Sequence, residues 1–138
     1  MALSSIVLQQ RNLDITACDH HPETKHFLDE NMRLNQLPNI DFHQADWNGI
    51  NVEMGKFDLI IGSDVLYESE HAGLLSAFIQ RHAEHSAEVI IVAPNRGHNA
   101  QFSKKMVNEG YDFDTLELNV GNTDGLIPKG RVLSYQRY

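Results

Sequence analysis

Hydrophobic residues follow two different periods along this chain, and these periods predict alternating helices and strands. Near the start, Leu3, Ile6 and Val7 recur at the spacing of one helix face. Helical spacing and helix-opening residues predict helices over 2–11, 20–37, 70–84 and 99–109. Apolar runs and β-prone segments predict strands over 14–18, 40–45, 57–62, 89–93, 111–120 and 131–138. Strands that alternate with helices are typical of an α/β fold built on a parallel sheet.

Two of the predicted strands are almost entirely apolar. The segments 57–62 and 89–93 are nearly continuous apolar runs, so we expect both strands to be buried on both faces of a parallel sheet. The last two strands flank a turn-forming segment, 121–130, which indicates a C-terminal antiparallel hairpin. Gly110 stands where a left-handed residue would end the preceding helix, and Ser69 is a candidate cap for the helix that follows it.

The composition is that of an ordinary globular protein. The chain has 138 residues, 41% hydrophobic and 22% charged, and this length predicts a single domain over 1–138. Eleven Lys and Arg against nineteen Asp and Glu give a net charge of -8, which argues against a nucleic-acid partner. The single cysteine, Cys18, excludes an intrachain disulfide, and no stretch approaches the roughly 20 apolar residues of a membrane span. We therefore expect a cytoplasmic protein with no membrane partner.

Aspartates follow three of the predicted strands. Asp19, Asp46 and Asp64 stand at strand carboxyl ends, which border the ligand site in open parallel sheets. In dinucleotide-type folds an acidic residue about 20 residues beyond a glycine-rich turn accepts hydrogen bonds from ribose hydroxyls, and we expect this role for Asp19. Counting back from Asp19 places that turn just before Met1. The alternative for Asp19 is a polar residue that starts a loop.

Asp46 and Asp64 each have an aromatic residue close by. Asp46-Trp47 pairs a hydrogen-bond acceptor with a large ring, which suits an exocyclic amine and an adenine face, although a tryptophan after a strand also serves in packing. Asp64 and Tyr67 are three residues apart and can face one cavity, where the carboxylate orients an amine and the phenol approaches a cation. The alternative is a polar loop that leads into the next helix.

The histidines and the cysteine are weaker candidates. The chain has eight histidines, among them His20-His21 and the nearby pair His82 and His85, but it has no HExxH-type spacing. We therefore expect solvated surface histidines and no metal site. Cys18 lies in a predicted strand with no evident base beside it, which favours a buried, inert thiol over a nucleophile.

The strand-end residues resemble those of a class I S-adenosylmethionine-dependent methyltransferase, and the resemblance spans nearly the whole chain. Within that superfamily, Asp46-Trp47 and the run Asp-Val-Leu-Tyr-Glu over 64–68 resemble the protein lysine methyltransferases that carry an Asp-x-x-Tyr motif. Amide-directed relatives usually carry Asn-Pro-Pro-Tyr at this place, so its absence counts against glutamine or exocyclic-amine targets. The resemblance implies a Rossmann-like, mostly parallel sheet with helices on both faces and a C-terminal antiparallel hairpin.

The resemblance also implies a cofactor and the residues that contact it. The cofactor is S-adenosylmethionine, and its contacts would be Asp19, His20, Asp46, Trp47 and Asp64. Asp19 would bind the ribose hydroxyls and Asp46 the adenine amine. Asp64 and Tyr67 would form the catalytic pair beside the methionyl end and the substrate amine.

One part of the family pattern is missing from the chain. The first strand and its Gly-x-Gly loop are absent. That loop lets the backbone approach the cofactor's amino-acid end, and without it we expect cofactor affinity to collapse. The missing strand would lie between the strands that end at Asp19 and Asp64. We therefore expect two exposed parallel edges, which pair with each other or with another copy of the chain in a homo-oligomer. We interpret the chain as a fragment, or as the product of an internal methionine start.

These observations lead to three hypotheses. The first is methyl transfer from S-adenosylmethionine to a lysine amine of a protein substrate. The second is a catalytically inactive truncated domain that self-associates. The third is a small-molecule methyltransferase, which differs from the first in its methyl acceptor.

Overall fold

The computed structural model describes residues 3–49, 53–94, 98–119 and 129–138, and its contacts divide the chain into two compact units, Met1–Met54 and Gly55–Tyr138. The first unit contains α1 (Leu3–Gln10), β1 (Thr16–Asp19), α2 (Thr24–Leu34) and β2 (Asp41–Gln44). The second contains β3 (Phe57–Ser63), α3 (His71–His82), β4 (Ala83–Pro94), α4 (Asn99–Asn108), β5 (Asp112–Asn119) and β6 (Lys129–Arg137). The predicted order of helices and strands is confirmed. One domain over 1–138 stays a prediction.

The first unit is built around a parallel strand pair. β1 and β2 run in register from Thr16 opposite Asp41 to Asp19 opposite Gln44, so their carboxyl ends lie side by side. A parallel pair needs a crossover connection, and α2 provides it. Residues from both helices and from the segment before β2 form the core of this unit, namely Ile6, Leu28, Met32 and Ile40.

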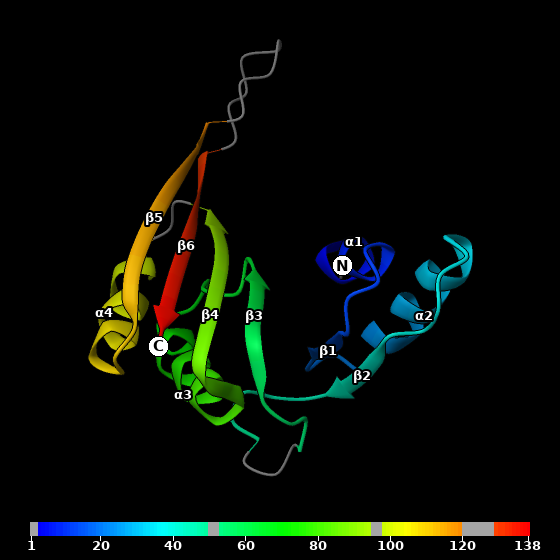
Figure 1. The fold of residues 1–138 in the computed structure, drawn as a ribbon, viewed down its shortest axis with the longest axis horizontal. Helices are drawn as coiled ribbons and strands as arrows, with labels where there is room; N and C mark the ends of the chain where they lie inside the picture. Colours follow the sequence, from blue (N-terminus) through cyan, green and yellow to red (C-terminus); the bar gives the residue numbers. More distant parts are fainter. Residues whose placement is uncertain (1–2, 50–52, 95–97, 120–128) are drawn as a thin grey trace. The chain divides into compact units, whose positions relative to one another are not determined.

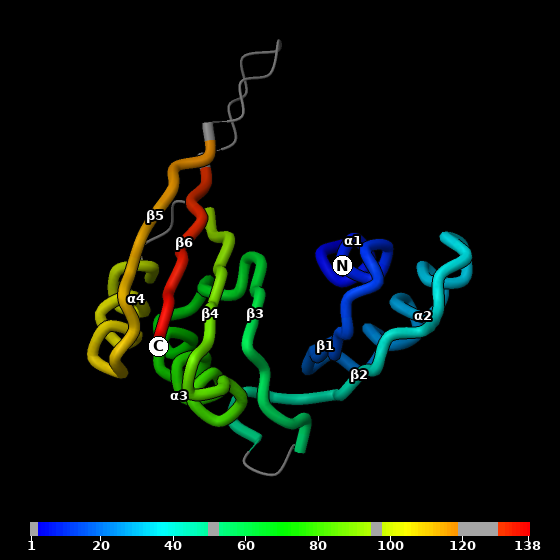
Figure 2. The backbone as a smooth tube through the Cα atoms, viewed as in Figure 1, coloured from blue at the N-terminus to red at the C-terminus, as the bar shows by residue number. Residues whose placement is uncertain are grey.

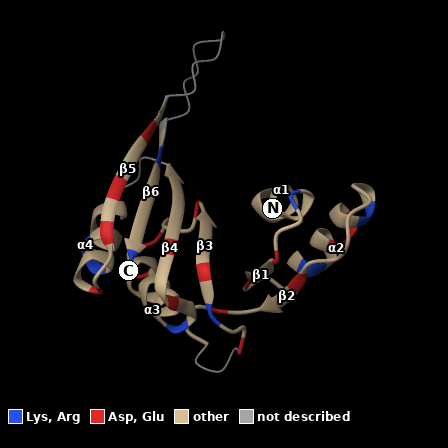
Figure 3. Ribbon diagram, in the orientation of Figure 1, with Lys and Arg blue, Asp and Glu red and all other residues tan. Residues whose placement is uncertain are grey.

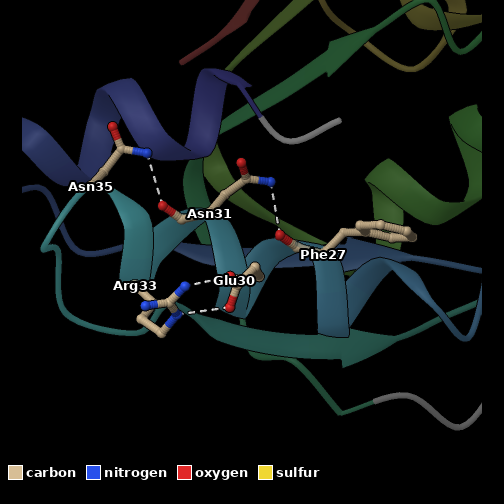
Figure 4. Close-up of polar contacts among 5 residues, drawn as sticks. All are labelled: Phe27, Glu30, Asn31, Arg33 and Asn35. Atoms are coloured by element: carbon tan, nitrogen blue, oxygen red, sulfur yellow. Dashed lines mark hydrogen bonds and ion pairs between the residues drawn. The ribbon is translucent and has the colours of Figure 1, made fainter.

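Polar contacts one helical turn apart line the exposed side of α2 (Figure 4). Arg33 donates from Nε and Nη2 to the two carboxylate oxygens of Glu30, at 2.8 and 2.6 Å. The side-chain amide of Asn31 donates to the carbonyl of Phe27 at 2.7 Å, and that of Asn35 donates to the carbonyl of Asn31 at 2.8 Å. Such pairs give a helix local support, while its opposite side packs in the core.

The second unit is a four-stranded mixed sheet in the order β3-β4-β6-β5 (Figure 1). β3 and β4 pair in parallel, whereas β6 pairs antiparallel with both β4 and β5. The predicted C-terminal antiparallel hairpin is therefore confirmed; of its predicted turn, 121–128 lie outside the described residues and Gly130 belongs to β6. Gly110 has a φ of 88°, which confirms the predicted left-handed residue after α4.

One face of this sheet packs on helices. Val89 and Ile91 of β4 are fully buried, and their register partners in β6 are Tyr135 and Leu133, which are also buried. Phe102 of α4 meets the Tyr135 ring edge to face, with 5.3 Å between the ring centroids. Alternate residues of the central strands therefore form the core, as the period of a strand requires.

The opposite face of the sheet is only partly covered. Leu59 and Ile61 of β3 keep 39% and 37% of their surface exposed. Ile90, the register partner of Ile61 in β4, is half-buried, and so is Val92 further along β4. The expectation that 57–62 and 89–93 are buried on both faces is therefore wrong. Among the described residues, β1 and β3 each have a strand partner on one side only, so both end their sheet as expected, and the exposure of these two edges stays a prediction.

The chain passes from α3 directly into β4 (Figure 2). The helix ends at His82, and Ala83 is already extended, with φ -83° and ψ 140°, so the predicted helix end at Glu84 is late. The helix begins after Glu70, where no side-chain capping hydrogen bond forms, and the cap predicted at Ser69 is wrong. Without a capping side chain, backbone hydrogen bonds to the carbonyl of Glu70 complete the first turn.

His82 is buried, which corrects the expectation of a solvated side chain. The residue is 6% exposed, and its ring lies 4.6 Å from the ring of Phe78, four residues earlier on α3. Its Nδ1 is within 3.2 Å of the carbonyl oxygen of Gly55, so the buried ring has a polar partner. His85, on β4, is exposed as expected.

Candidate functional site

Asp19 and His20 stand at the carboxyl end of β1. Oδ1 of Asp19 accepts a hydrogen bond from the backbone N–H of His21 at 2.9 Å and lies 3.4 Å from Nδ1 of His20. The Asp19 side chain is 35% exposed. Both contacts use one oxygen, and a carboxylate has about four acceptor positions, so Asp19 keeps the capacity to accept hydroxyl hydrogens.

The end of β2 lies beside this position. The backbone N–H of Ala45 donates to the carbonyl oxygen of Asp19 at 3.0 Å, and the Gln44 side-chain amide donates to the carbonyl oxygen of His20 at 3.2 Å. The two strand ends are therefore tied together immediately before Asp46.

Asp46 begins a turn at the end of β2. Its Oδ1 accepts from the backbone N–H of Asn48 at 3.1 Å, and its carbonyl accepts from that of Gly49 at 2.8 Å. Asp46 is exposed, and Trp47 is half-buried. The structure thus brings Asp46-Trp47 and Asp19 to one edge of the first unit, with an acceptor carboxylate from each strand.

In the second unit, Asp64 follows β3 in an uncommon backbone conformation. Its φ of 52° is left-handed, and its backbone N–H donates to the carbonyl oxygen of Val92 in β4 at 2.8 Å. Aspartate tolerates this region better than most residues, but such conformations persist only where the surroundings enforce them, and they cluster at functional sites. Leu66, 3% exposed, holds the following loop in the core.

Tyr67 is the predicted partner of Asp64, and it contacts a residue that the sequence interpretation missed. Tyr67 is 49% exposed, and its ring meets that of His71 at 87°, with 4.4 Å between the centroids. The His71 side chain is 12% exposed, and its Nε2 lies 3.6 Å from Oε2 of Glu68. The signal was the spacing, because residues three and four apart become neighbours at the start of a helix.

A second residue that sequence interpretation missed lies just before Asp64. A Cβ atom at Gly62 would lie 2.9 Å from Cδ1 of Ile91 and 3.1 Å from Cγ2 of Val65. Glycine therefore lets the end of β3 approach the core and the loop closely. The sequence signal was an isolated glycine inside an apolar strand.

Cys18 is exposed, so the expectation of a buried thiol is wrong. Protein atoms still crowd the sulfur, and this desolvation, together with the Asp19 carboxylate, raises the pKa of Cys18 to about 11. Because the thiolate is the nucleophile, a thiol with this pKa reacts poorly at neutral pH, and the inert thiol stays a prediction.

The predicted site residues form two groups, one in each unit. The first group offers two carboxylates beside an aromatic side chain, and these groups suit hydroxyls and an exocyclic amine. The second offers Asp64 and Tyr67, which suit an amine. Among the described residues no group of three or more His, Cys, Asp or Glu is arranged to hold a metal ion.

Two further surface features lie away from these groups. A shallow hollow of about 200 Å³ is lined by residues that include Asp58, Glu88 and Gln136, at the opposite end of β3 from Asp64. Figure 3 shows acidic residues along β5, while Lys and Arg are spread over several elements of the described chain. The exclusion of nucleic acid stays a prediction.

A comparison with protein families identifies the chain. A family model described as "Lysine methyltransferase" matches residues 1–109. The chain belongs to this methyltransferase family. The predicted class, an S-adenosylmethionine-dependent methyltransferase, is confirmed, and with it the predicted cofactor. No curated protein matches the sequence.

Solved structures with low sequence identity share the fold of this methyltransferase. A methyltransferase from Pyrococcus furiosus has 17% identity and a TM-score of 0.79, over 99% of this chain and 69% of its own. Magnesium protoporphyrin IX methyltransferase from Synechocystis, with bound SAM, has 20% identity and a TM-score of 0.73, over 97% of this chain and 64% of its own. The chain thus spans about two thirds of these relatives, and the predicted Rossmann-like fold class is confirmed.

The residues of the first group fit part of the cofactor. Asp19 and Asp46 present partly exposed carboxylates at neighbouring strand ends, which suits ribose hydroxyls and an adenine amine. The sequence contains no Gly-x-Gly to approach the amino-acid end. In addition, none of the described helices of the methyltransferase is long and apolar enough to cross a membrane.

Proposed function

We propose that this methyltransferase acts on a lysine amine of a protein. Asp19 and Asp46 would hold the ribose and adenine of S-adenosylmethionine, with His20 and Trp47 beside them. The bound cofactor supplies a methyl group on a positively charged sulfur. Such a donor is intrinsically reactive, so the protein contributes mainly orientation and exclusion of water.

One observation carries the proposal, namely the constrained end of β3. Asp64 is held in a left-handed conformation by its hydrogen bond to Val92, and Tyr67 follows with half of its surface exposed. A fixed carboxylate can accept a hydrogen bond from an amine, and a phenol ring can contact the methylene chain that carries it. The description of the matching family supports a lysine acceptor.

Asp64 and Tyr67 would have separate tasks. The carboxylate would orient the amine nitrogen by accepting one of its hydrogens, which directs the nitrogen lone pair. The Tyr67 ring would shield the amine from water, which favours its uncharged, nucleophilic form. Removing the carboxylate is therefore expected to reduce turnover more than cofactor binding.

The experiment measures binding and transfer separately. Calorimetry with S-adenosylhomocysteine compares the chain as printed with a version extended upstream, and we expect the extended version to bind more tightly and Asp19→Ala to abolish its binding. Transfer of labelled methyl groups to proteins of a lysate is measured with the same chain and with a version extended upstream. We expect Asp64→Asn to reduce transfer at least tenfold, as loss of an orienting group typically does (on the order of 10 to 100-fold).

Asp58→Asn is the matched control, because Asp58 is an exposed aspartate at the other end of the same strand. It should leave binding and transfer unchanged. Equal transfer by wild type and Asp64→Asn would contradict the proposed role. Label found only in the small-molecule fraction would replace the lysine acceptor by a small molecule.

A second candidate follows from the two sheet ends. β1 and β3 each have a strand partner on one side among the described residues, and Leu59 and Ile61 are exposed on β3. Such edges favour self-association into a homo-oligomer without catalysis. Absence of S-adenosylhomocysteine binding, with sedimentation as a species larger than a monomer, would favour this candidate over methyl transfer.

A further inference from the structure

The ring of Tyr67, an exposed side chain, packs against the ring of His71, a side chain that is mostly buried. Tyr67 follows an irregular loop and is 49% exposed, and exposed side chains exchange rotamers readily. His71 is the first residue of α3, and its side chain is 12% exposed. One ring therefore has a fixed position, and the other packs against it at 87°.

His71 is itself held from the loop side. Its backbone N–H donates to the carbonyl oxygen of Glu68 at 3.2 Å, and its Nε2 lies 3.6 Å from the Glu68 carboxylate. Glu68 is the residue next to Tyr67. Glu68 thus contacts both the backbone and the imidazole of His71, and it belongs to the same loop as Tyr67.

We infer that His71 is a positioning residue, which holds the Tyr67 ring in one orientation at the carboxyl end of β3. This inference rests on the proposed function, because Tyr67 is the side chain that would cover the amine. Edge-to-face aromatic pairs are favourable beyond the area that they bury. The free energy of such a pair, converted to a ratio, corresponds to about a 2- to 12-fold preference for the packed orientation of Tyr67.

Glu68 restrains the His71 ring through its side chain. A carboxylate at ion-pair distance restrains the imidazole through Nε2, so the ring plane of His71 is fixed as well as its position. Glu68→Gln should keep the packing with a weaker restraint. We expect its effect on Tyr67 to be smaller than that of removing the imidazole.

The first measurement is nuclear magnetic resonance of the full chain, which needs no activity. We expect nuclear Overhauser effects between the His71 and Tyr67 rings, and Tyr67 ring shifts that differ from random-coil values. His71→Ala should move these shifts toward random coil, whereas His71→Phe, which retains a ring, should preserve most of the displacement. His85→Ala is the control, because His85 is an exposed histidine of the same unit. Unchanged Tyr67 shifts in His71→Ala would overturn the inference.

The second measurement uses steady-state methyl transfer. We expect His71→Ala to lower kcat by about 2- to 12-fold with an unchanged KM for the cofactor, and His71→Phe to recover most of the loss. Displaced Tyr67 shifts with an unchanged kcat would overturn the positioning role. If wild type transfers no methyl group, the proposed function fails, and the resonance data still decide whether His71 orders Tyr67.

Discussion

A methyl group added at Gly62 tests how closely the end of β3 approaches the core. In Gly62→Ala the new Cβ would lie 2.9 Å from Cδ1 of Ile91, a residue with no exposed surface. Carbon atoms pack best at about 3.5 to 4.0 Å, so one of the two must move by roughly 0.6 Å or more. Overpacking of this kind costs about 1 to 3 kcal/mol, and replacing a strand glycine returns about 0.5 to 1 kcal/mol. We therefore expect a net loss of about 1 kcal/mol.

Ile91→Val removes Cδ1, the atom nearest to the new Cβ, and so isolates the free-energy cost of that contact. By itself it should cost about 0.5 to 1.5 kcal/mol as a small cavity forms. In the double variant Gly62→Ala/Ile91→Val the 2.9 Å contact is removed, while the 3.1 Å contact with Cγ2 of Val65 remains. We therefore expect the double variant to be more stable than the sum of the single effects by about 1 kcal/mol. Urea unfolding followed by circular dichroism measures all four proteins, and amide exchange within β4 reports on this unit alone.

Gly73→Ala is the matched control for the same chemical change. Gly73 lies in α3, and a Cβ there would have Lys105 as its nearest neighbour, at 3.9 Å. Alanine should therefore stabilise the protein by about 0.5 to 1 kcal/mol. A Gly62→Ala variant as stable as wild type, or additive effects in the double variant, would refute the steric argument.

Two further predictions concern titratable groups. Burial raises the pKa of the Tyr135 phenol to about 12, above that of the unfolded chain, so its contribution to stability is fully present below about pH 10 and is lost as pH rises through 12. Tyr135→Phe loses the 2.8 Å hydrogen bond to Ser103, so it should cost about 0.5 to 1.5 kcal/mol of stability near pH 8. It should also lose less stability than wild type between pH 8 and pH 11. Urea unfolding at the two pH values measures both effects, and an equal loss of stability in the two proteins would contradict the prediction. Cys18, with a pKa of about 11, should react with iodoacetamide near pH 8 about tenfold more slowly than in the urea-unfolded chain, because a hundredfold smaller thiolate fraction is partly offset by greater nucleophilicity. Equal rates in folded and unfolded protein would contradict the desolvation of the sulfur.

The periodic pattern predicts the order of elements because helix and strand spacing are local properties. The β5–β6 hairpin and the left-handed Gly110 follow from turn chemistry, which is also local. Burial depends instead on what lies beside each strand. Leu59 and Ile61 belong to an apolar run that suits a central strand, yet they are partly exposed because β3 ends its sheet.

The candidate site shows the same division. Parallel register brings Asp19 and Asp46 to one edge, and this follows from the positions of the strand ends alone. The left-handed turn at Asp64 depends on a hydrogen bond to Val92, a distant residue of β4, so no local pattern encodes it. The contact between His71 and Tyr67 is local, and the spacing of four residues was its signal. His82 was misplaced for a related reason: a histidine at a helix end suits solvent equally well until a carbonyl partner from another segment is known.

The strand order of the second unit also constrains the sequence of folding events. β6 is the last strand along the chain, yet it lies between β4 and β5, and Arg137 bonds the carbonyl of His85 across 52 residues of sequence. β3 and β4 can pair early around α3, because their connection is local, but β5 has no place in the sheet until β6 has docked. Closing so large a loop costs entropy before any contact repays it. During synthesis, the core around Tyr135 therefore forms only after β6 has emerged from the ribosome.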